Sequence, residues 1–328
     1  MAFGAVVVLT LLASAYAFPS DAVFSKFDDS GPRYDYVEDD AGQLHLEDHW
    51  IKMSDLARMA RYNPDNSNRY HLFTRANPSR SQVLVRNNVN SIINSNFIAG
   101  RRTIVLMHGF AGSATSNFNS VLVPAFLAAQ DVNVIVVDWS SGSAWGPNAR
   151  QAGQAAGRFI TWLNEVSGAT PNNYHIAGYS VGGHGAGIIA RTMAGNVSYV
   201  TAMDPAARWN NRWLFRSDDG LYTEVIHTNV NNIGFTNPLG HVDFYPNGGR
   251  NMPGCITSLC DHERSFHYMA ETLRTGGFTG RRCANLPDAL NQRCNASGTL
   301  SMGGIAPKTG LSGIFHLRTN ARQPFSQG

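Results

Sequence analysis

The sequence predicts an α/β fold with a mostly parallel central sheet flanked by helices. Three observations lead to this prediction. The 328 residues include 43% hydrophobic and only 15% charged residues, a composition typical of a globular protein with a sizeable core. Uninterrupted apolar runs of strand length indicate strands that are buried on both faces of a sheet. These runs alternate with helical segments, which favours a parallel sheet covered by helices.

The expected strands and helix follow one another from residue 103 onward. Segments 103–107 (TIVLM) and 132–137 (VNVIVV) are the clearest strands, because they contain almost only aliphatic side chains. Further strands are expected at 174–177, 197–203 and 222–227. Segment 148–166 is expected to form an amphipathic helix, because its apolar residues recur at steps of three and four. These are Ala149, Ala152, Ala156, Phe159, Leu163 and Val166.

The N-terminal segment has the pattern of a secretory signal peptide. An apolar stretch up to residue 12 is followed by Ala15-Tyr16-Ala17, a small-x-small motif that predicts removal of residues 1–17 by cleavage before Phe18. Residues 18–76 are acidic and form either a leader or propeptide, or an extension packed on the domain. We therefore expect a secreted, extracellular protein with one folded domain at residues 77–328.

Charge and cysteine content limit the partners and the compartment. The net charge of +3 is too small to indicate a nucleic-acid partner. Four cysteines in a secreted protein suggest disulfides, for which three connectivities are open. We expect sequential pairing, Cys255 with Cys260 and Cys283 with Cys294, because it closes two small loops. A zinc site that includes His262 is disfavoured, since no CxxC pair supports it.

The strongest local signal is the pentapeptide Gly178-Tyr179-Ser180-Val181-Gly182, which fits the G-x-S-x-G pattern. It follows a short strand and precedes the helical segment 181–194, as in a nucleophile elbow that holds its serine at a sharp, strained turn. Side chains at the flanking positions would collide, so both are glycine. The alternative is an ordinary serine in a glycine-rich turn. The context favours Ser180 as a nucleophile.

Such a serine needs a histidine base and a carboxylate that orients the base, in the chain order serine, acid, histidine. Asp204 ends the next apolar strand, so it is expected at the same edge of the sheet as Ser180. The alternative for Asp204 is a capping or turn aspartate, while Asp138 has a similar place but precedes Ser180. Position alone does not decide among the histidines that follow, His227, His241, His262 and His267.

Seven segments together resemble the pancreatic (neutral) lipase family, including its phospholipase A1 members and insect relatives. They appear in the family's order: HGF at 108–110, VDW at 137–139, GYSVGGH at 178–184, MDPA at 203–206, VIHT at 225–228, GHVDFYPNGG at 240–249 and CDHERS at 260–265. The resemblance implies an α/β-hydrolase fold in which Ser180 is the nucleophile, Asp204 the acid and His262 the base. It also implies an oxyanion hole formed by the backbone N–H groups of Phe110 and Val181.

The region that relatives use as a lid is short in this sequence. In many family members a long loop between two cysteines covers the site, whereas Cys255 and Cys260 enclose only the four residues 256–259. Four residues do not cover an acyl-binding groove. In having so short a loop, the sequence resembles phospholipase A1 and galactolipase members more than a strict triacylglycerol lipase. The family's C-terminal lipid-binding β-sandwich is absent from the sequence, so no colipase-type partner is expected.

No metal or cofactor is expected. Some relatives bind calcium, but in this sequence only Asp218 and Asp219 lie in the corresponding region, with few other oxygen ligands. Asn196 and Asn295 each begin an N-x-S motif and are candidate N-glycosylation sites.

These observations favour a secreted carboxylic ester hydrolase, a lipase that acts at a lipid aggregate or membrane surface through an acyl-enzyme. The substrate stays open among triacylglycerol, phospholipid and galactolipid. The second hypothesis is a non-catalytic lipid-binding or yolk-type storage protein. Some insect relatives have lost the triad for such a role, whereas all three residue types are present in this sequence. A peptidase on the same fold is a third interpretation, which the seven matching segments disfavour.

Overall fold

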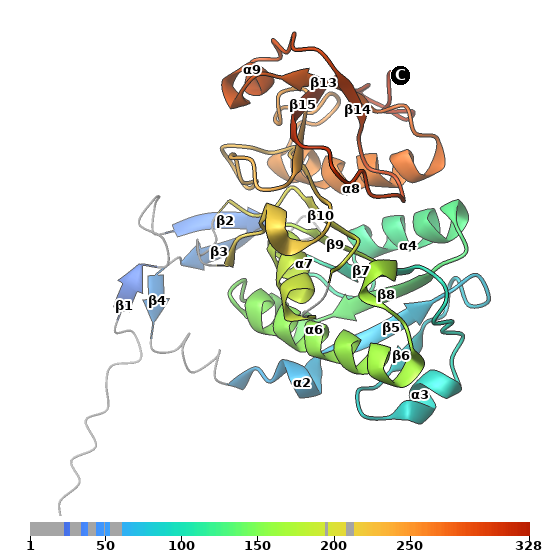
Figure 1. Ribbon diagram of the computed structural model, residues 1–328. Helices are drawn as coiled ribbons and strands as arrows, with labels where there is room; N and C mark the ends of the chain where they lie inside the picture. The colour runs from blue at the N-terminus through green and yellow to red at the C-terminus, as the bar shows by residue number, and fades with distance from the viewer. Residues whose placement is uncertain are drawn as a thin grey trace, which may run out of the picture.

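An eleven-stranded sheet lies at the centre of the part of the chain that the structure describes (Figure 1). The computed structural model describes residues 61–193, 196–207 and 213–328 with their side chains, and before them only the backbone of four strands. These are β1 (Val23–Lys26), paired with β4 (Trp50–Lys52), and β2 (Tyr34–Glu38), paired with β3 (Leu44–Asp48). The predicted signal segment, residues 1–17, lies outside the described residues.

Parallel strands form the middle of the large sheet and antiparallel strands form its two edges. The parallel strands are β7 (Thr103–Met107), β8 (Asn133–Asp138), β9 (Tyr174–Tyr179), β10 (Tyr199–Met203), β11 (Thr223–Ile226), β12 (Val242–Pro246) and β15 (Gly313–Leu317). The antiparallel strands are β5 (Arg69–Phe73), β6 (Gln82–Leu84), β13 (Thr279–Cys283) and β14 (Thr299–Ser301), of which β6 and β14 are outermost. The order is β14-β13-β15-β12-β11-β10-β9-β7-β8-β5-β6. This mostly parallel sheet confirms the predicted fold class.

Helices cover both faces of the sheet. The helices that cover it are α4 (Asn117–Ala129), α6 (Asn148–Ser167), α7 (Val181–Thr192) and α8 (Ser258–Arg274). Helices α6 and α7 pack together on one face, and α4 and α8 pack together on the other. The predicted helix is confirmed, and Gly168 ends it with a left-handed φ of 76°. Within the described ranges, no helix has the length and apolar character that a membrane span requires.

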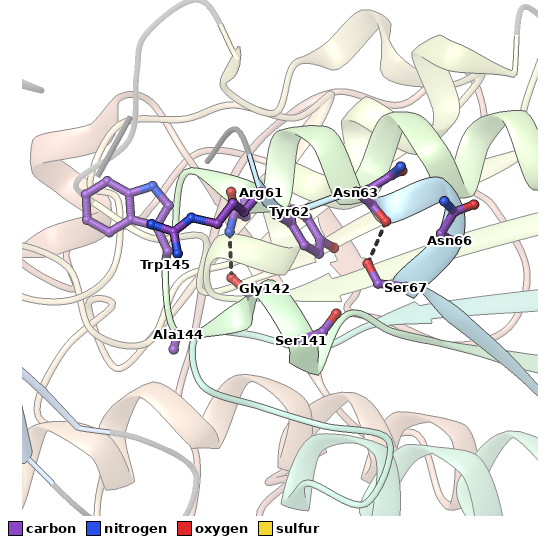
Figure 2. A pocket seen from close by; sticks show the side chains of 10 residues that line it. Arg61, Tyr62, Asn63, Asn66, Ser67, Ser141, Gly142, Ala144 and Trp145 are labelled. Atoms are coloured by element: carbon purple, nitrogen blue, oxygen red, sulfur yellow. Dashed lines mark hydrogen bonds between the residues drawn. The ribbon is translucent and has the colours of Figure 1, made fainter. Parts of the chain in front are cut away.

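Four short α-helices occupy connections within the described residues. They are α2 (Pro64–Ser67), α3 (Val89–Ile93), α5 (Ser140–Ser143) and α9 (Leu286–Leu290). A pocket lies between α2 and the segment that runs from α5 to the start of α6 (Figure 2).

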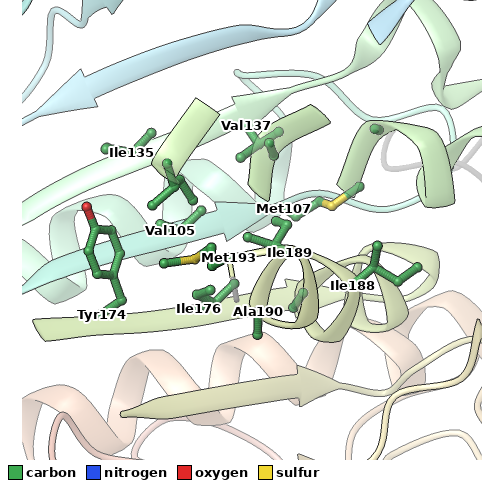
Figure 3. Close-up of a cluster of buried hydrophobic side chains, with 14 of the residues drawn as sticks. Val105, Met107, Ile135, Val137, Tyr174, Ile176, Ile188, Ile189, Ala190 and Met193 are labelled. Carbon is green, nitrogen blue, oxygen red and sulfur yellow. The ribbon is translucent and has the colours of Figure 1, made fainter. Parts of the chain in front are cut away.

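The side chains of β7 alternate between the two helical layers, as the two-residue period of a strand requires. Val105 and Met107 face α6 and α7, where they join the cluster of aliphatic side chains in Figure 3. Ile104 and Leu106 face the opposite way and join the cluster under α4 and α8. Because both faces are buried, the four positions after Thr103 are all apolar, which explains the uninterrupted run in the sequence.

The folded domain begins earlier than the boundary expected at residue 77, because it includes strand β5. This strand lies inside the acidic segment 18–76, yet it pairs with β8 along its whole length. Tyr70 of β5 stacks on Phe159 of α6, with 3.7 Å between the ring centroids. The last part of that segment therefore belongs to the folded domain. The sequence did not reveal this strand because polar residues occupy alternate positions of β5, on its less buried face.

Candidate active site

Ser180 lies at the sharp turn between β9 and α7. Its backbone has φ 57° and ψ −128°, a left-handed conformation that is strained for any residue with a Cβ atom. A Cβ atom on Gly178 would lie 1.9 Å from the carbonyl oxygen of Gly182. A Cβ atom on Gly182 would lie 2.3 Å from the carbonyl oxygen of Met107. The two glycines are therefore required for the turn, and the pentapeptide has the elbow geometry that its spacing predicts.

Asp204 follows β10, the neighbour of β9, and is fully buried. Its Oδ1 accepts the backbone N–H groups of Thr228 at 2.7 Å and Asn229 at 3.0 Å. Its Oδ2 lies 2.5 Å from Nδ1 of His262. These donors compensate the buried negative charge and fix the orientation of the carboxylate.

His262 is the fifth residue of α8, and its ring packs against the residue that precedes the elbow serine. A neutral ring that donates Nδ1–H to Asp204 carries its free lone pair on Nε2. Nε2 is buried and has no hydrogen-bond partner among the described residues. The ring packs on Tyr179, the residue before Ser180, with 4.6 Å between centroids. The arrangement leaves one basic nitrogen on a ring that packs against the residue before Ser180.

Two of the other histidine candidates, His227 and His241, are engaged elsewhere. Both ring nitrogens of His227 have partners, one of them Oδ1 of Asp243 at 2.9 Å. His241 contacts the start of β11 through its Nδ1. The structure thus brings His262, and not these two, to Asp204.

The loop after β7 lies directly against the elbow. A Cβ atom on Gly109 would be 3.1 Å from Cβ of Ser180, so the next residue, Phe110, borders the nucleophile. Val181 is the first residue of α7, where backbone N–H groups have no partner within the helix. The carbonyl oxygen of Ser143 accepts an N–H of the loop at 2.9 Å and holds it from the other side. Of the two predicted oxyanion residues, Val181 follows Ser180 in the chain, and Phe110 follows the glycine that lies against Ser180.

The structure contains the two expected disulfides. The Cα atoms of Cys255 and Cys260 are 5.4 Å apart, and those of Cys283 and Cys294 are 4.4 Å apart. The first disulfide closes the short loop directly before His262. The side chain of Ile256 in this loop is 100% exposed, so the loop does not fold over the site.

Two residues without a catalytic role in the sequence prediction connect the acid to the histidine. Thr228 and Asn229, the clamp pair, each donate their backbone N–H to Asp204. Thr228 also donates its Oγ1 hydroxyl to the carbonyl oxygen of His262 at 3.3 Å. Asn229 donates Nδ2 to the carbonyl oxygen of Ser258, the first residue of α8, at 2.8 Å. The clamp pair therefore fixes the acid and the base relative to each other.

Replacing Asn229 with alanine is expected to lower kcat on a soluble ester such as p-nitrophenyl butyrate about ten- to a hundredfold, with KM little changed. The backbone donor to Asp204 remains, but α8 loses an anchor, and a small displacement of His262 slows proton transfer. Asn232→Ala is the matched control, because Nδ2 of Asn232 also contacts Ser258, at 2.7 Å, from an exposed position. Equal losses in both variants, or a change in KM alone, would contradict the positioning role.

The remaining candidate positions are ion-pair or surface residues. Oδ1 of Asp219 accepts from Nη1 of Arg191 at 2.5 Å. Burial raises the pKa of Asp219 to about 6, against the opposing effect of Arg191. Asp218, the other carboxylate of this region, is exposed, and so are the sequon residues Asn196 and Asn295.

The sequence of the chain is similar to those of known lipases. A family model described as Lipase matches residues 47–325. Pancreatic lipase-related protein 2 of Cavia porcellus is 32% identical, over 79% of this chain and 65% of that protein. The pancreatic triacylglycerol lipase of Equus caballus is 31% identical, over 81% of this chain and 67% of that protein. The chain thus spans about two thirds of the length of these relatives.

One solved structure is similar over a smaller part of the fold. The thermostable carboxylesterase EstE1 from a metagenomic library shares 18% sequence identity over 34% of this chain and 40% of its own, with a TM-score of 0.27. Such a partial likeness adds nothing to the fold that the strand order already establishes.

Proposed function

The chain belongs to the lipase family, which includes the pancreatic triacylglycerol lipases, and from this premise we propose that it is a secreted serine hydrolase that cleaves acyl esters of lipids. The observation that carries the proposal is the 2.5 Å contact between Asp204 and His262, next to a serine held at a strained elbow. This combination supplies a nucleophile, a base and an orienting acid in one place.

The proposed reaction has two halves. Ser180 attacks the acyl carbonyl while Nε2 of His262 takes the hydroxyl proton, and the N–H groups of Phe110 and Val181 stabilise the oxyanion. The imidazolium then protonates the departing alcohol oxygen, which leaves an acyl-enzyme. Water, activated by the same histidine, attacks the acyl-enzyme and releases the fatty acid. Asp204 keeps the proton of the neutral ring on Nδ1 and stabilises the imidazolium in both halves.

A fluorophosphonate probe distinguishes this proposal from a non-catalytic lipid-binding or storage role. An activated serine attacks the phosphorus and forms a stable adduct, whereas a serine without a base does not. We expect one adduct per chain, located at Ser180 by peptide mass spectrometry. The absence of labelling in folded protein would favour the storage hypothesis.

Secretion is part of the proposal. The signal-like segment at residues 1–17 supports it, and so do the two disulfides, because disulfides persist in oxidising compartments. N-terminal sequencing of the secreted protein is expected to give Phe18, or a later residue if the acidic leader is also removed.

Activity is expected to rise smoothly with substrate concentration, without a jump at the solubility limit of the ester. The loop between Cys255 and Cys260 is too short to cover an acyl groove, so an aggregate has no cover to displace. The measurement is the initial rate on tributyrin below and above its solubility limit. A large jump would mean that another segment covers the site.

A further inference from the structure

His184, the last residue of the GYSVGGH segment, takes no part in the mechanism proposed above, although its side chain is fully buried. It lies in α7, about one helical turn after Ser180. Helix α7 packs against β10, the strand that Asp204 follows. A side chain at this position can therefore connect the helix that begins at the nucleophile with the strand that ends at the acid.

The His184 ring joins two segments that are distant from it in the chain. Its Nε2 lies 2.9 Å from the carbonyl oxygen of Ala206, two residues after Asp204. Its Nδ1 accepts the backbone N–H of Phe215 at 3.1 Å. A carbonyl oxygen only accepts and a backbone N–H only donates, so the neutral ring carries its proton on Nε2. Burial lowers the pKa of His184 to about 4, so at neutral pH the ring is uncharged and makes both bonds.

The turn that contains the acid is strained. Asp204 has a φ of 42°, a left-handed conformation that residues other than glycine rarely adopt. Neighbouring backbone holds this turn from one side, because the carbonyl oxygen of Pro205 accepts the N–H of Phe235 at 2.7 Å. A Cβ atom on Gly234 would lie 2.4 Å from Oδ1 of Asp204, so the same segment lies directly against the carboxylate. His184 adds an anchor from α7.

A displacement of this turn would change the position of the acid. The proposed triad depends on the 2.5 Å contact between Oδ2 of Asp204 and Nδ1 of His262. Misplacing a catalytic group by about 1 Å can lower a rate about a hundredfold. Because the carbonyl group that His184 holds is only two residues from Asp204, loss of that bond allows the strained turn to relax and the carboxylate to move away from His262.

We propose that His184 is a positioning residue, which fixes the turn of the acid to the helix of the nucleophile and thereby keeps Asp204 in contact with His262. The bond responsible is the one from Nε2 to the carbonyl oxygen of Ala206. This inference rests on the proposed function and deepens it, because it adds a residue that acts on the reaction through the acid.

The first test replaces each of two fully buried histidines with leucine. His175 is the matched control, because it is as buried as His184 but lies at the other end of β9 from Ser180, with its Nε2 2.8 Å from Oγ1 of Thr201. Both variants should lower the melting temperature, since each leaves a buried polar group without its partner. On p-nitrophenyl butyrate, His184→Leu is expected to lower kcat about ten- to a hundredfold with KM little changed. His175→Leu should keep kcat within a fewfold of the wild type.

Glutamine and asparagine at position 184 separate the two bonds of the ring. The side-chain nitrogen of glutamine occupies the place of Nε2 along the side chain, so His184→Gln can still donate to Ala206. The side-chain oxygen of asparagine occupies the place of Nδ1, so His184→Asn can still accept from Phe215. We expect His184→Gln to recover most of the wild-type kcat and His184→Asn to show the loss seen in His184→Leu. If His184→Asn does not fold, the comparison of His184→Leu with His184→Gln decides.

Proton NMR of the enzyme without substrate reports on the acid directly. The proton on Nδ1 of His262, in its short bond to Asp204, should give a resonance far downfield of the backbone amides. We expect this resonance to move upfield or disappear in His184→Leu and to remain in His175→Leu. The measurement does not require turnover. If the wild type hydrolyses no ester, the proposed function fails, and the NMR comparison still tests the role of His184.

Three results would overturn the assignment. The first is an equal loss of kcat in His184→Leu and His175→Leu, which would indicate general destabilisation. The second is an unchanged downfield resonance in His184→Leu. The third is a kcat that is retained in His184→Asn and lost in His184→Gln, because that pattern would assign the effect to the bond with Phe215.

Discussion

Replacing Ser180 with alanine is expected to remove ester hydrolysis almost completely, with a loss of about a millionfold in kcat on p-nitrophenyl butyrate. The hydroxyl oxygen is the only atom lost, and it is the atom that forms the acyl-enzyme bond. Alanine keeps the Cβ atom, so the strained φ of 57° and the packing against Gly109 are unchanged. The melting temperature should therefore stay close to that of the wild type.

The control for Ser180→Ala is Ser113→Ala, in the partly buried loop that follows the oxyanion segment. That variant should keep most of its activity and should still react with the fluorophosphonate probe. Undiminished hydrolysis by folded Ser180→Ala would show that another nucleophile acts. A parallel loss in Ser113→Ala would show that the loop, and not the elbow hydroxyl, limits the reaction.

Features that depend on local sequence could be predicted well. The elbow could be recognised because a strained serine between a strand and a helix requires glycine at fixed positions. The buried strands could be recognised because most positions of a strand that is covered on both faces are apolar. By contrast, β5, β6, β13 and β14 mix polar and apolar residues over only three to five positions, a pattern that loops also produce.

The choice of histidine was not determined by local sequence. His262 is 58 residues from Asp204 in the chain, and His227 lies at the end of a strand next to a carboxylate of its own, Asp243. Only the three-dimensional fold shows that His262 pairs with Asp204 and that His227 pairs with Asp243. The clamp pair could not be predicted for another reason. Thr228 and Asn229 bind Asp204 through backbone N–H groups, and since every residue except proline has such a group, the residue types give no signal.

The two acid–histidine pairs provide the second large prediction, a loss of about 10⁴-fold in kcat for Asp204→Asn. In the wild type, Oδ1 of Asp204 accepts the N–H groups of Thr228 and Asn229. An asparagine must place its carbonyl oxygen at that position, because its NH₂ group would face two donors. The NH₂ group then faces Nδ1 of His262, and this nitrogen becomes an acceptor.

A histidine that accepts at Nδ1 carries its proton on Nε2, so it cannot take the proton of Ser180. The loss in Asp204→Asn thus comes from the wrong tautomer in a preserved geometry, and the melting temperature should change little. Asp243→Asn is the matched control, because Asp243 is equally buried and contacts His227 at 2.9 Å. It is expected to lower the melting temperature while kcat stays within a fewfold of the wild type. A large loss of kcat in Asp243→Asn, or a small loss in Asp204→Asn, would show that Asp204 is not the acid of the triad.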